Sequence, residues 1–170
     1  MDLKQVIRTI PDFPQPGIIF RDITPILQDG ECLRQTIRQI EALLPQEDFD
    51  LILGPESRGF IFGVPLAFHM GKGFVPVRKA GKLPAETVSK TYSLEYGTAT
   101  IEMHRDAVAP GQKVVVVDDL LATGGTSKAL AQLVEECGGI VVSMVFVIEL
   151  EGLGGRKLLE KYDVQSVLKY

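Results

Sequence analysis

Apolar and polar positions along the chain follow two different periods, and segments of the two kinds alternate. Short continuous apolar runs rich in Val and Ile are typical of strands buried on both faces. Between them, apolar residues at helical spacing, such as Leu33, Ile37 and Ile40, are typical of helices with one buried face. The alternation predicts an α/β fold, in which helices flank a mostly parallel twisted sheet within a single domain, residues 1–170. The expected strands are 49–53, 74–79, 114–117, 140–148 and 164–168, and the expected helices are 29–44, 60–70, 127–134 and 156–161.

The strand Val114–Val117 is the centre of this pattern. Four valines in succession leave no polar face, so the strand is expected in the middle of the sheet. Asp118 and Asp119 follow it, and a loop with Gly124 and Gly125 leads into the next helix. In open α/β sheets, ligands bind where a strand ends and a loop leads into a helix.

The loop and the two acids are suited to bind different parts of one ligand. Backbone N–H groups of the loop and the positive end of the following helix suit a phosphate. Asp118 and Asp119 would repel a phosphate, but carboxylates accept hydrogen bonds from the vicinal hydroxyls of a ribose. The stretch therefore predicts a site for a ribose 5-phosphate.

A second strand, loop and helix unit supplies positive charge. The strand 49–53 ends in a Gly-rich loop that carries Arg58, before the helix 60–70. Further on, cations gather in the sequence between Lys72 and Lys90, with Glu86 as the one acid among them. This basic cluster predicts an anionic small ligand on a chain whose net charge is −4.

Two other segments fall outside the regular alternation. Residues 2–10 could form a short helix, and the prolines that follow force an extended path into an apolar piece around Phe20. Phe20 is either a core aromatic or a stacking face for a planar ligand. Residues 80–91 show no period, and such a stretch in a compact domain indicates a lid or a disordered loop.

Composition and known motifs exclude several classes of protein. The negative net charge argues against general nucleic-acid binding, and no apolar run reaches the length of a membrane span. The first residues do not match a signal peptide, so a cytoplasmic location is expected. The loop at 124–128 lacks the lysine placement of a Walker A motif, and no Gly-x-Gly-x-x-Gly follows a strand. His69 and His104 are isolated, so any metal is expected to arrive with the substrate, as Mg²⁺ usually does.

At Asp118–Thr126 the sequence resembles the phosphoribosyl diphosphate loop of the type I phosphoribosyltransferase family. The Leu-Leu-Ala variant inside this loop is similar to the adenine-specific branch. Four further segments resemble the same branch, in order along nearly the whole chain: Phe13–Pro25, Glu56–Phe60, Arg78–Pro84 and Tyr92–Gly97.

The resemblance implies transfer of a phosphoribosyl group from 5-phosphoribosyl 1-diphosphate to N9 of adenine, giving AMP and pyrophosphate with Mg²⁺. It implies a base-binding hood at 1–28, a flexible lid at 80–96, a homodimer and a place in purine salvage. Glu95 would be the acid/base residue, and Asp118 and Asp119 would hold the ribose. The remaining implied contacts are to the 5′-phosphate (Ala122, Thr123, Gly124, Gly125, Thr126), to pyrophosphate (Glu56, Ser57, Arg58, Arg78, Lys79, Lys82, Tyr96) and to adenine (Ile19, Phe20, Arg21, Leu150).

Two alternatives remain open at this point. A phosphoribosyltransferase for another purine base would share the fold and the phosphate loop and would differ in the base pocket. A regulator that senses phosphoribosyl diphosphate and binds nucleic acid would need an added basic surface, for which the chain has little room.

Overall fold

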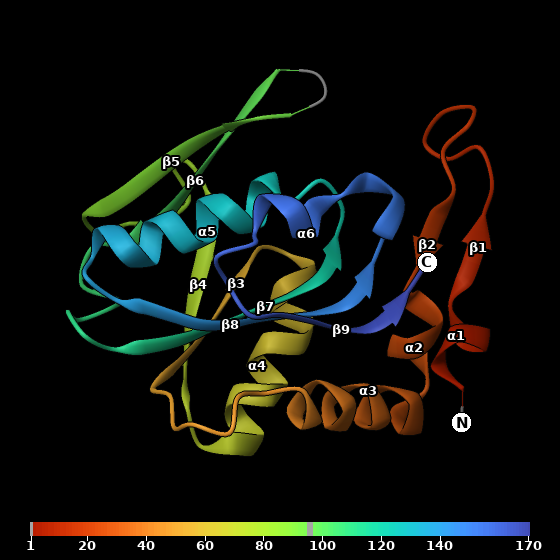
Figure 1. Ribbon diagram of the computed structural model, residues 1–170, viewed down its shortest axis with the longest axis horizontal. Coiled ribbons are helices and arrows are strands. Elements are labelled where there is room, and N and C mark those ends of the chain that lie inside the picture. Colours follow the sequence, from red (N-terminus) through yellow and green to blue (C-terminus); the bar gives the residue numbers. More distant parts are fainter. Residues whose placement is uncertain (1, 95–96) are drawn as a thin grey trace.

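The computed structural model describes residues 2–94 and 97–170, and its centre is one large sheet (Figure 1). Within the described residues, seven strands lie in the order β5-β6-β4-β3-β7-β8-β9. Five neighbouring strands, β4, β3, β7, β8 and β9, are parallel, whereas β6 is antiparallel to both β4 and β5. The strand bounds are β3 Leu51–Pro55, β4 Gly73–Lys79, β5 Thr87–Ser93, β6 Thr98–His104, β7 Lys113–Leu121, β8 Ile140–Glu149 and β9 Val164–Lys169.

Helices cover both faces of this sheet, as the alternating pattern predicts. Figure 1 shows α3 and α4 on one face and α5 with α6 on the other. Each face has its own apolar core, and β7 contributes to both. The helix bounds are α3 Gly30–Ala42, α4 Arg58–Met70, α5 Gly125–Glu136 and α6 Gly155–Leu158.

The strand β7 is central, as predicted, but it extends further than the valine run. Val114 and Val116 pack into one core while Val115 and Val117 pack into the other, and all four are fully buried. The strand continues to Leu121, because it keeps pairing with β8 up to Glu149. Asp118 and Asp119 therefore lie inside the strand rather than after it, and the backbone holds them in fixed positions.

The N-terminal segment forms a small unit beside the main sheet. The strands β1 (Arg8–Ile10) and β2 (Phe20–Asp22) pair antiparallel, between the short helices α1 (Leu3–Val6) and α2 (Thr24–Gln28). Figure 1 shows this pair standing apart from the seven-stranded sheet. The expected helix over 2–10 is thus wrong in its second half, since Arg8 to Ile10 pair with β2.

The expectation of an irregular stretch at 80–91 is wrong from Thr87 onward. The strand β5 pairs with β6 over its whole length. Val88, Lys90 and Tyr92 are its more buried positions, and Lys90 pairs with Glu136 of α5. Lys90 therefore replaces the apolar residue that would have revealed the strand period.

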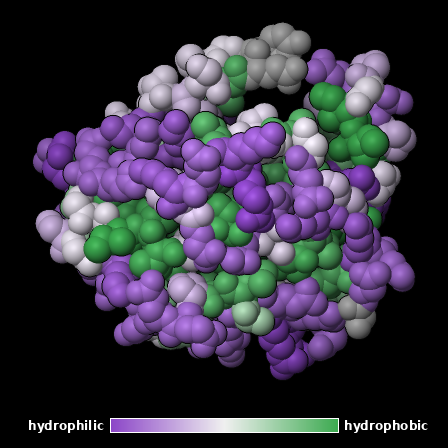
Figure 2. Space-filling model, in the orientation of Figure 1, coloured by the Kyte–Doolittle hydropathy of each residue, from purple (hydrophilic) through white to green (hydrophobic). Residues whose placement is uncertain are grey.

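The outer surface of α5 and α6 is mostly hydrophilic. Figure 2 shows polar residues over most of the α5 and α6 side. In the part of the chain that the structure describes, no helix combines the length and the apolar character that crossing a membrane requires.

Candidate active site

Two buried carboxylates form the floor of the candidate site. The side chains of Asp118 and Asp119 belong to residues that are only 8% and 5% exposed. The backbone N–H of Asp119 donates to Asp118 Oδ1 at 2.8 Å. Arg58, the first residue of α4, places its Nε 3.0 Å from Asp119 Oδ2. The two predicted ribose residues therefore lie beside a predicted pyrophosphate residue.

Burial dominates the electrostatics of this acid pair. It raises the pKa of Asp118 well above its usual range, and the neighbouring charge of Asp119 raises it further. Burial also raises the pKa of Asp119, although the Arg58 guanidinium opposes that rise. A site of this kind favours a ligand that donates hydrogen bonds or carries positive charge.

The phosphate loop adjoins the acids, as the sequence predicts. A small hollow of about 190 Å³ is lined by Arg58, by both acids and by the loop from Ala122 through Ser127. The helix α5 begins at Gly125, two residues earlier than expected. The first N–H groups of a helix have no acceptor within it, so those of α5 are placed to bind an anion in this hollow.

The backbone of Gly155 packs against the phosphate loop at Ala122 and Gly124. No pattern in the sequence indicated this role. A Cβ on Gly124 would lie 2.8 Å from the Gly155 carbonyl oxygen, and a Cβ on Gly155 would collide with the Ala122 carbonyl oxygen. Gly124 also has a φ of +86°, a conformation that side chains rarely adopt. The two backbones touch only because both residues lack a side chain.

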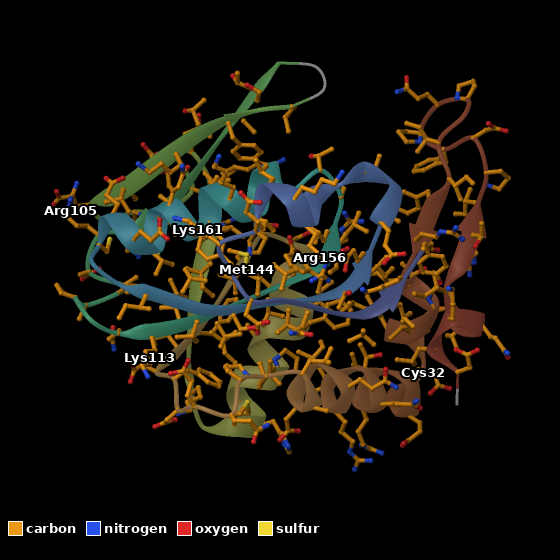
Figure 3. All side chains as sticks on the ribbon, in the orientation of Figure 1. Cys32, Arg105, Lys113, Met144, Arg156 and Lys161 are labelled. Carbon is orange, nitrogen blue, oxygen red and sulfur yellow. The ribbon has the colours of Figure 1, made fainter. Side chains whose placement is uncertain are left out.

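An ion pair beside Gly155 holds the start of α6, and with it Gly155, against the end of β8. Arg156, labelled on α6 in Figure 3, donates to both carboxylate oxygens of Glu149 at 2.9 and 2.6 Å. Ser166 donates to the same carboxylate, whose side chain is 4% exposed. These contacts, led by the Arg156 hydrogen bonds, lower the pKa of Glu149. The end of β8 is thereby joined to the start of α6.

Three of the predicted pyrophosphate residues, Glu56, Arg78 and Lys79, line a larger cavity of about 630 Å³. Glu56 accepts a hydrogen bond from the Lys79 backbone N–H at 2.7 Å, and Arg78 Nε lies 3.3 Å from the same carboxylate oxygen. The Lys79 N–H is the main reason that the pKa of Glu56 is lowered. The Glu56–Ser57 peptide bond is cis. Glu56, Arg78, Lys79, Tyr92 and Thr126 are among the residues that line the cavity.

The basic cluster between Lys72 and Lys90 is not one surface, which corrects the prediction from the sequence. Lys72 precedes β4 and pairs with Asp48, whereas Arg78 lies near the other end of that strand. Lys90 is held by Glu136 on α5. Lys82 is exposed and is not among the residues that line the 630 Å³ cavity. Lys72 and Arg78 are close in sequence, but they lie at opposite ends of the extended strand β4.

The predicted adenine residues are not among the residues that line either cavity. Phe20 and Arg21 belong to β2, and Phe20 packs edge-on against Phe13 with ring centroids 5.1 Å apart. Ile19 is exposed. Leu150 follows β8 and is half-buried. Glu95 and Tyr96 lie outside the described residues.

Tyr92 is a further site residue that the sequence analysis did not single out. Its hydroxyl lies 3.0 Å from the hydroxyl of Thr126, and its ring reaches over Gly125. The residue therefore joins a strand within the predicted lid, residues 80–96, to the phosphate loop. The only signal in the sequence is its place at the start of the Tyr-Ser-Leu-Glu-Tyr-Gly segment.

Tyr92→Phe is expected to raise the KM for the phosphorylated substrate about three- to fivefold. The variant keeps the ring but removes one hydrogen bond to Thr126, and such a bond contributes about 0.5–1.5 kcal/mol. Steady-state kinetics check the result. Tyr162→Phe is the matched control, because it removes the hydroxyl bonded to Glu135 on the outer side of α5. An unchanged KM in Tyr92→Phe would contradict the link to the loop.

Comparison with known proteins identifies the family. The model of the phosphoribosyl transferase domain matches residues 26–168. The chain is 60% identical to the adenine phosphoribosyltransferase of Lachnoclostridium phytofermentans, over 99% of this chain and 97% of that protein. It is 64% identical to the adenine phosphoribosyltransferase of Agathobacter rectalis, with the same coverage.

Solved structures agree with these sequence matches. The adenine phosphoribosyltransferase of Thermoanaerobacter pseudethanolicus superposes with a TM-score of 0.97 at 57% identity, covering 99% of this chain and 98% of that one. The Saccharomyces cerevisiae enzyme, solved with adenine and an imino-altritol bisphosphate, has a TM-score of 0.93 at 40% identity and covers 98% and 96%. The protein therefore belongs to the adenine phosphoribosyltransferases, a group within the phosphoribosyl transferase domain family.

Proposed function

We propose that the protein transfers the 5-phosphoribosyl group of 5-phosphoribosyl 1-diphosphate to N9 of adenine, giving AMP and pyrophosphate in purine salvage. The observation that carries the proposal is the hollow shared by two buried acids and a glycine loop at a helix N-terminus. A ribose 5-phosphate supplies both partners that this hollow needs, hydroxyl donors and an anion. Membership of the family adds the diphosphate leaving group and the base.

Asp118 and Asp119 would bind the ribose 2′- and 3′-hydroxyls. As pyrophosphate departs from C1′, the ring gains positive charge, and two carboxylates in a buried site stabilise that charge more than water would. The loop from Ala122 to Thr126 would hold the 5′-phosphate through backbone N–H groups. Holding the phosphate and the hydroxyls together fixes C1′ for attack.

Glu56, Ser57, Arg58, Arg78 and Lys79 would surround the leaving pyrophosphate, with Lys82 and Tyr96 added from the proposed lid, residues 80–96. Arg78 and Lys79 already line the 630 Å³ cavity. The Glu56 carboxylate now contacts the Arg78 guanidinium and the Lys79 backbone N–H, and a diphosphate would compete with it for these donors.

Mg²⁺ would accompany the diphosphate. Among residues 2–94 and 97–170, no group of three or more His, Cys, Asp or Glu side chains is placed to hold a metal. An ion held mainly by substrate oxygens needs no such group in the protein. When bound, Mg²⁺ would neutralise charge on the leaving group.

The hood, residues 1–28, would bind the base. The ring of Phe20 would stack on one face of adenine, with Leu150 on the other, and backbone groups of Ile19 and Arg21 would read its edge. The half-buried state of Phe20 and Leu150 supports this role, because each still has an accessible face.

Glu95→Gln is expected to lower kcat about 100-fold, with little change in the KM for phosphoribosyl diphosphate. Glutamine keeps the size of the side chain but cannot take up the proton that adenine must lose or shift as N9 attacks. The pH profile of kcat should lose its acidic limb in this variant. Glu86→Gln, in the same segment of the chain, is the control, since its carboxylate is held by Arg105. A wild-type pH profile in Glu95→Gln would contradict the assignment.

A substrate panel tests the proposed function directly. The protein is mixed with phosphoribosyl diphosphate, Mg²⁺ and adenine, hypoxanthine, guanine or xanthine, and nucleotide formation is followed by chromatography. AMP is the expected product, at a rate well above that of the other nucleotides. Faster turnover of another base would support the alternative purine enzyme, and no turnover with any base would overturn the proposal.

We also propose that the protein is a homodimer in the cytoplasm. On α4, Phe68 is 88% exposed and Val64 is 46% exposed, and residues four apart lie on one helix face. A second copy of the chain would cover this apolar face. Sedimentation of the intact protein at several concentrations tests the dimer; a monomer throughout the range would contradict it.

The cytoplasmic location is supported by the phosphorylated substrate, which does not cross membranes unaided.

A further inference from the structure

Tyr170 connects the hood to the main sheet. Its ring lies beneath the Arg21 guanidinium, whose Cζ is 4.0 Å from the ring centroid. Lys4 Nζ lies 4.7 Å from the same centroid and donates to the Lys169 carbonyl oxygen at 2.8 Å. A cation over an aromatic face is an attractive contact, and it strengthens as water is excluded. The ring therefore holds two cations of the hood at once.

The backbone of Tyr170 holds the segment around Leu150. The Tyr170 N–H donates to the Glu149 carbonyl oxygen at 3.0 Å, and the Glu151 N–H donates to the Tyr170 carbonyl oxygen at 2.9 Å. These two bonds lie on either side of Leu150. Glu149 is itself fixed by Arg156, so the segment has a rigid anchor.

The contacts of Tyr170 thus reach both sides of the proposed base slot. Arg21 is adjacent to Phe20 in β2, and Glu149 and Glu151 are adjacent to Leu150. Arg21 is further held by Thr9 of β1, whose hydroxyl accepts from its Nη1 at 2.6 Å. A shift of Tyr170 would move the hood relative to the Leu150 segment.

We propose that Tyr170 is a positioning residue that sets the spacing between Phe20 and Leu150 and so determines affinity for the base. The proposal rests on the base slot of the proposed function. The contact that carries this role is the one between the Arg21 guanidinium and the Tyr170 ring, so position 170 requires an aromatic side chain. The Tyr170 hydroxyl has a minor part, since it is 3.5 Å from its acceptor, the Lys4 carbonyl oxygen.

Tyr170→Ala is expected to raise the KM for adenine about tenfold while the KM for phosphoribosyl diphosphate stays within about twofold, since a tenfold change equals about 1.4 kcal/mol. Tyr170→Phe keeps the ring and is expected to behave as the wild type. Tyr170→Leu keeps an apolar side chain without the aromatic face and is expected to resemble Tyr170→Ala. Melting temperatures show whether each variant is folded.

Phe20→Ala, measured in parallel, separates the failure of the two proposals. If Phe20→Ala raises the KM for adenine and Tyr170→Ala does not, the base slot stands and the role of Tyr170 is overturned. If neither variant changes it, the base slot itself is wrong. Should Tyr170→Ala raise both KM values equally, Tyr170 would be a general stabilising residue, which also overturns the proposal. Should Tyr170→Ala fail to fold, Tyr170→Leu and Tyr170→Phe still decide between an aromatic and an apolar requirement.

Discussion

Asp118→Asn is expected to raise the melting temperature by about 3–6 °C while lowering kcat/KM roughly 100-fold. The native carboxylate is buried beside Asp119, and both burial and that neighbour raise its pKa. An amide of the same shape removes the buried charge and can still accept the Asp119 N–H. Relief of this kind stabilises a domain by about 1–2 kcal/mol, and each kcal/mol moves the melting temperature of a chain this size by about 2–4 °C. Turnover falls because the charge that stabilises the developing cation is lost.

The gain in stability should depend on pH in a defined direction. The pKa of Asp118 is raised in the folded state, so the charged carboxylate lowers the stability of the fold. This destabilisation is fully present when the pH is above the folded pKa. As the pH falls through the folded pKa toward that of an unfolded aspartate, the carboxyl takes up a proton and the destabilisation disappears. The difference in melting temperature between the variant and the wild type should therefore be larger at neutral pH than in acid, and it should shrink on acidification.

Calorimetry across pH, with steady-state kinetics at neutral pH, checks both parts. Asp106→Asn is the matched control, because Asp106 is exposed and the substitution removes the same charge. Asp118→Asn combined with Asp119→Asn should lose most turnover and keep the fold. Near-normal activity in the double variant would reject the ribose role, and a lower melting temperature in Asp118→Asn would reject the account of buried charge.

The sequence was most informative where one local pattern dictated both structure and chemistry. The four valines of β7 could only be a central strand, and the acids and glycines after them had to lie at its ligand-binding end. The structure places Asp118, Asp119 and the loop in one hollow, as that pattern predicts. Arg58 joins them because the loop before α4 ends beside β7.

Contacts between distant segments could not be predicted in the same way. Lys90 obscured the strand period of β5, because the Glu136 that accounts for a buried lysine is on another element, α5. Tyr170 meets Arg21 across nearly the whole chain, and a lone tyrosine carries no local signal of such a contact. Gly155 is one of seventeen glycines, and only its distance to the Ala122 and Gly124 backbones distinguishes it.

Gly155→Ala is therefore an informative substitution at a position that binds no substrate. The added Cβ would collide with the Ala122 carbonyl oxygen, and it would also press on the Leu121 side chain at 2.9 Å and the Gly124 nitrogen at 3.1 Å. The phosphate loop must then move, because these are mostly backbone atoms that cannot rotate away. A displacement of about 1 Å in a positioning element can cost about 100-fold in rate. We expect kcat/KM for phosphoribosyl diphosphate to fall by about that factor.

Gly152→Ala provides the matched comparison, three residues away in the same segment. A Cβ at Gly152 meets no atom within 4 Å, and its φ is not in the left-handed region, so kinetics close to the wild type are expected. Overpacking at Gly155 should also lower the stability by about 1–3 kcal/mol, so melting temperatures establish that the loss of activity is measured on folded protein. A folded Gly155→Ala variant with an unchanged KM for phosphoribosyl diphosphate would show that the loop does not depend on this support. The expected loss would instead place part of the phosphate site in the backbone of α6, outside every motif that contacts the substrate.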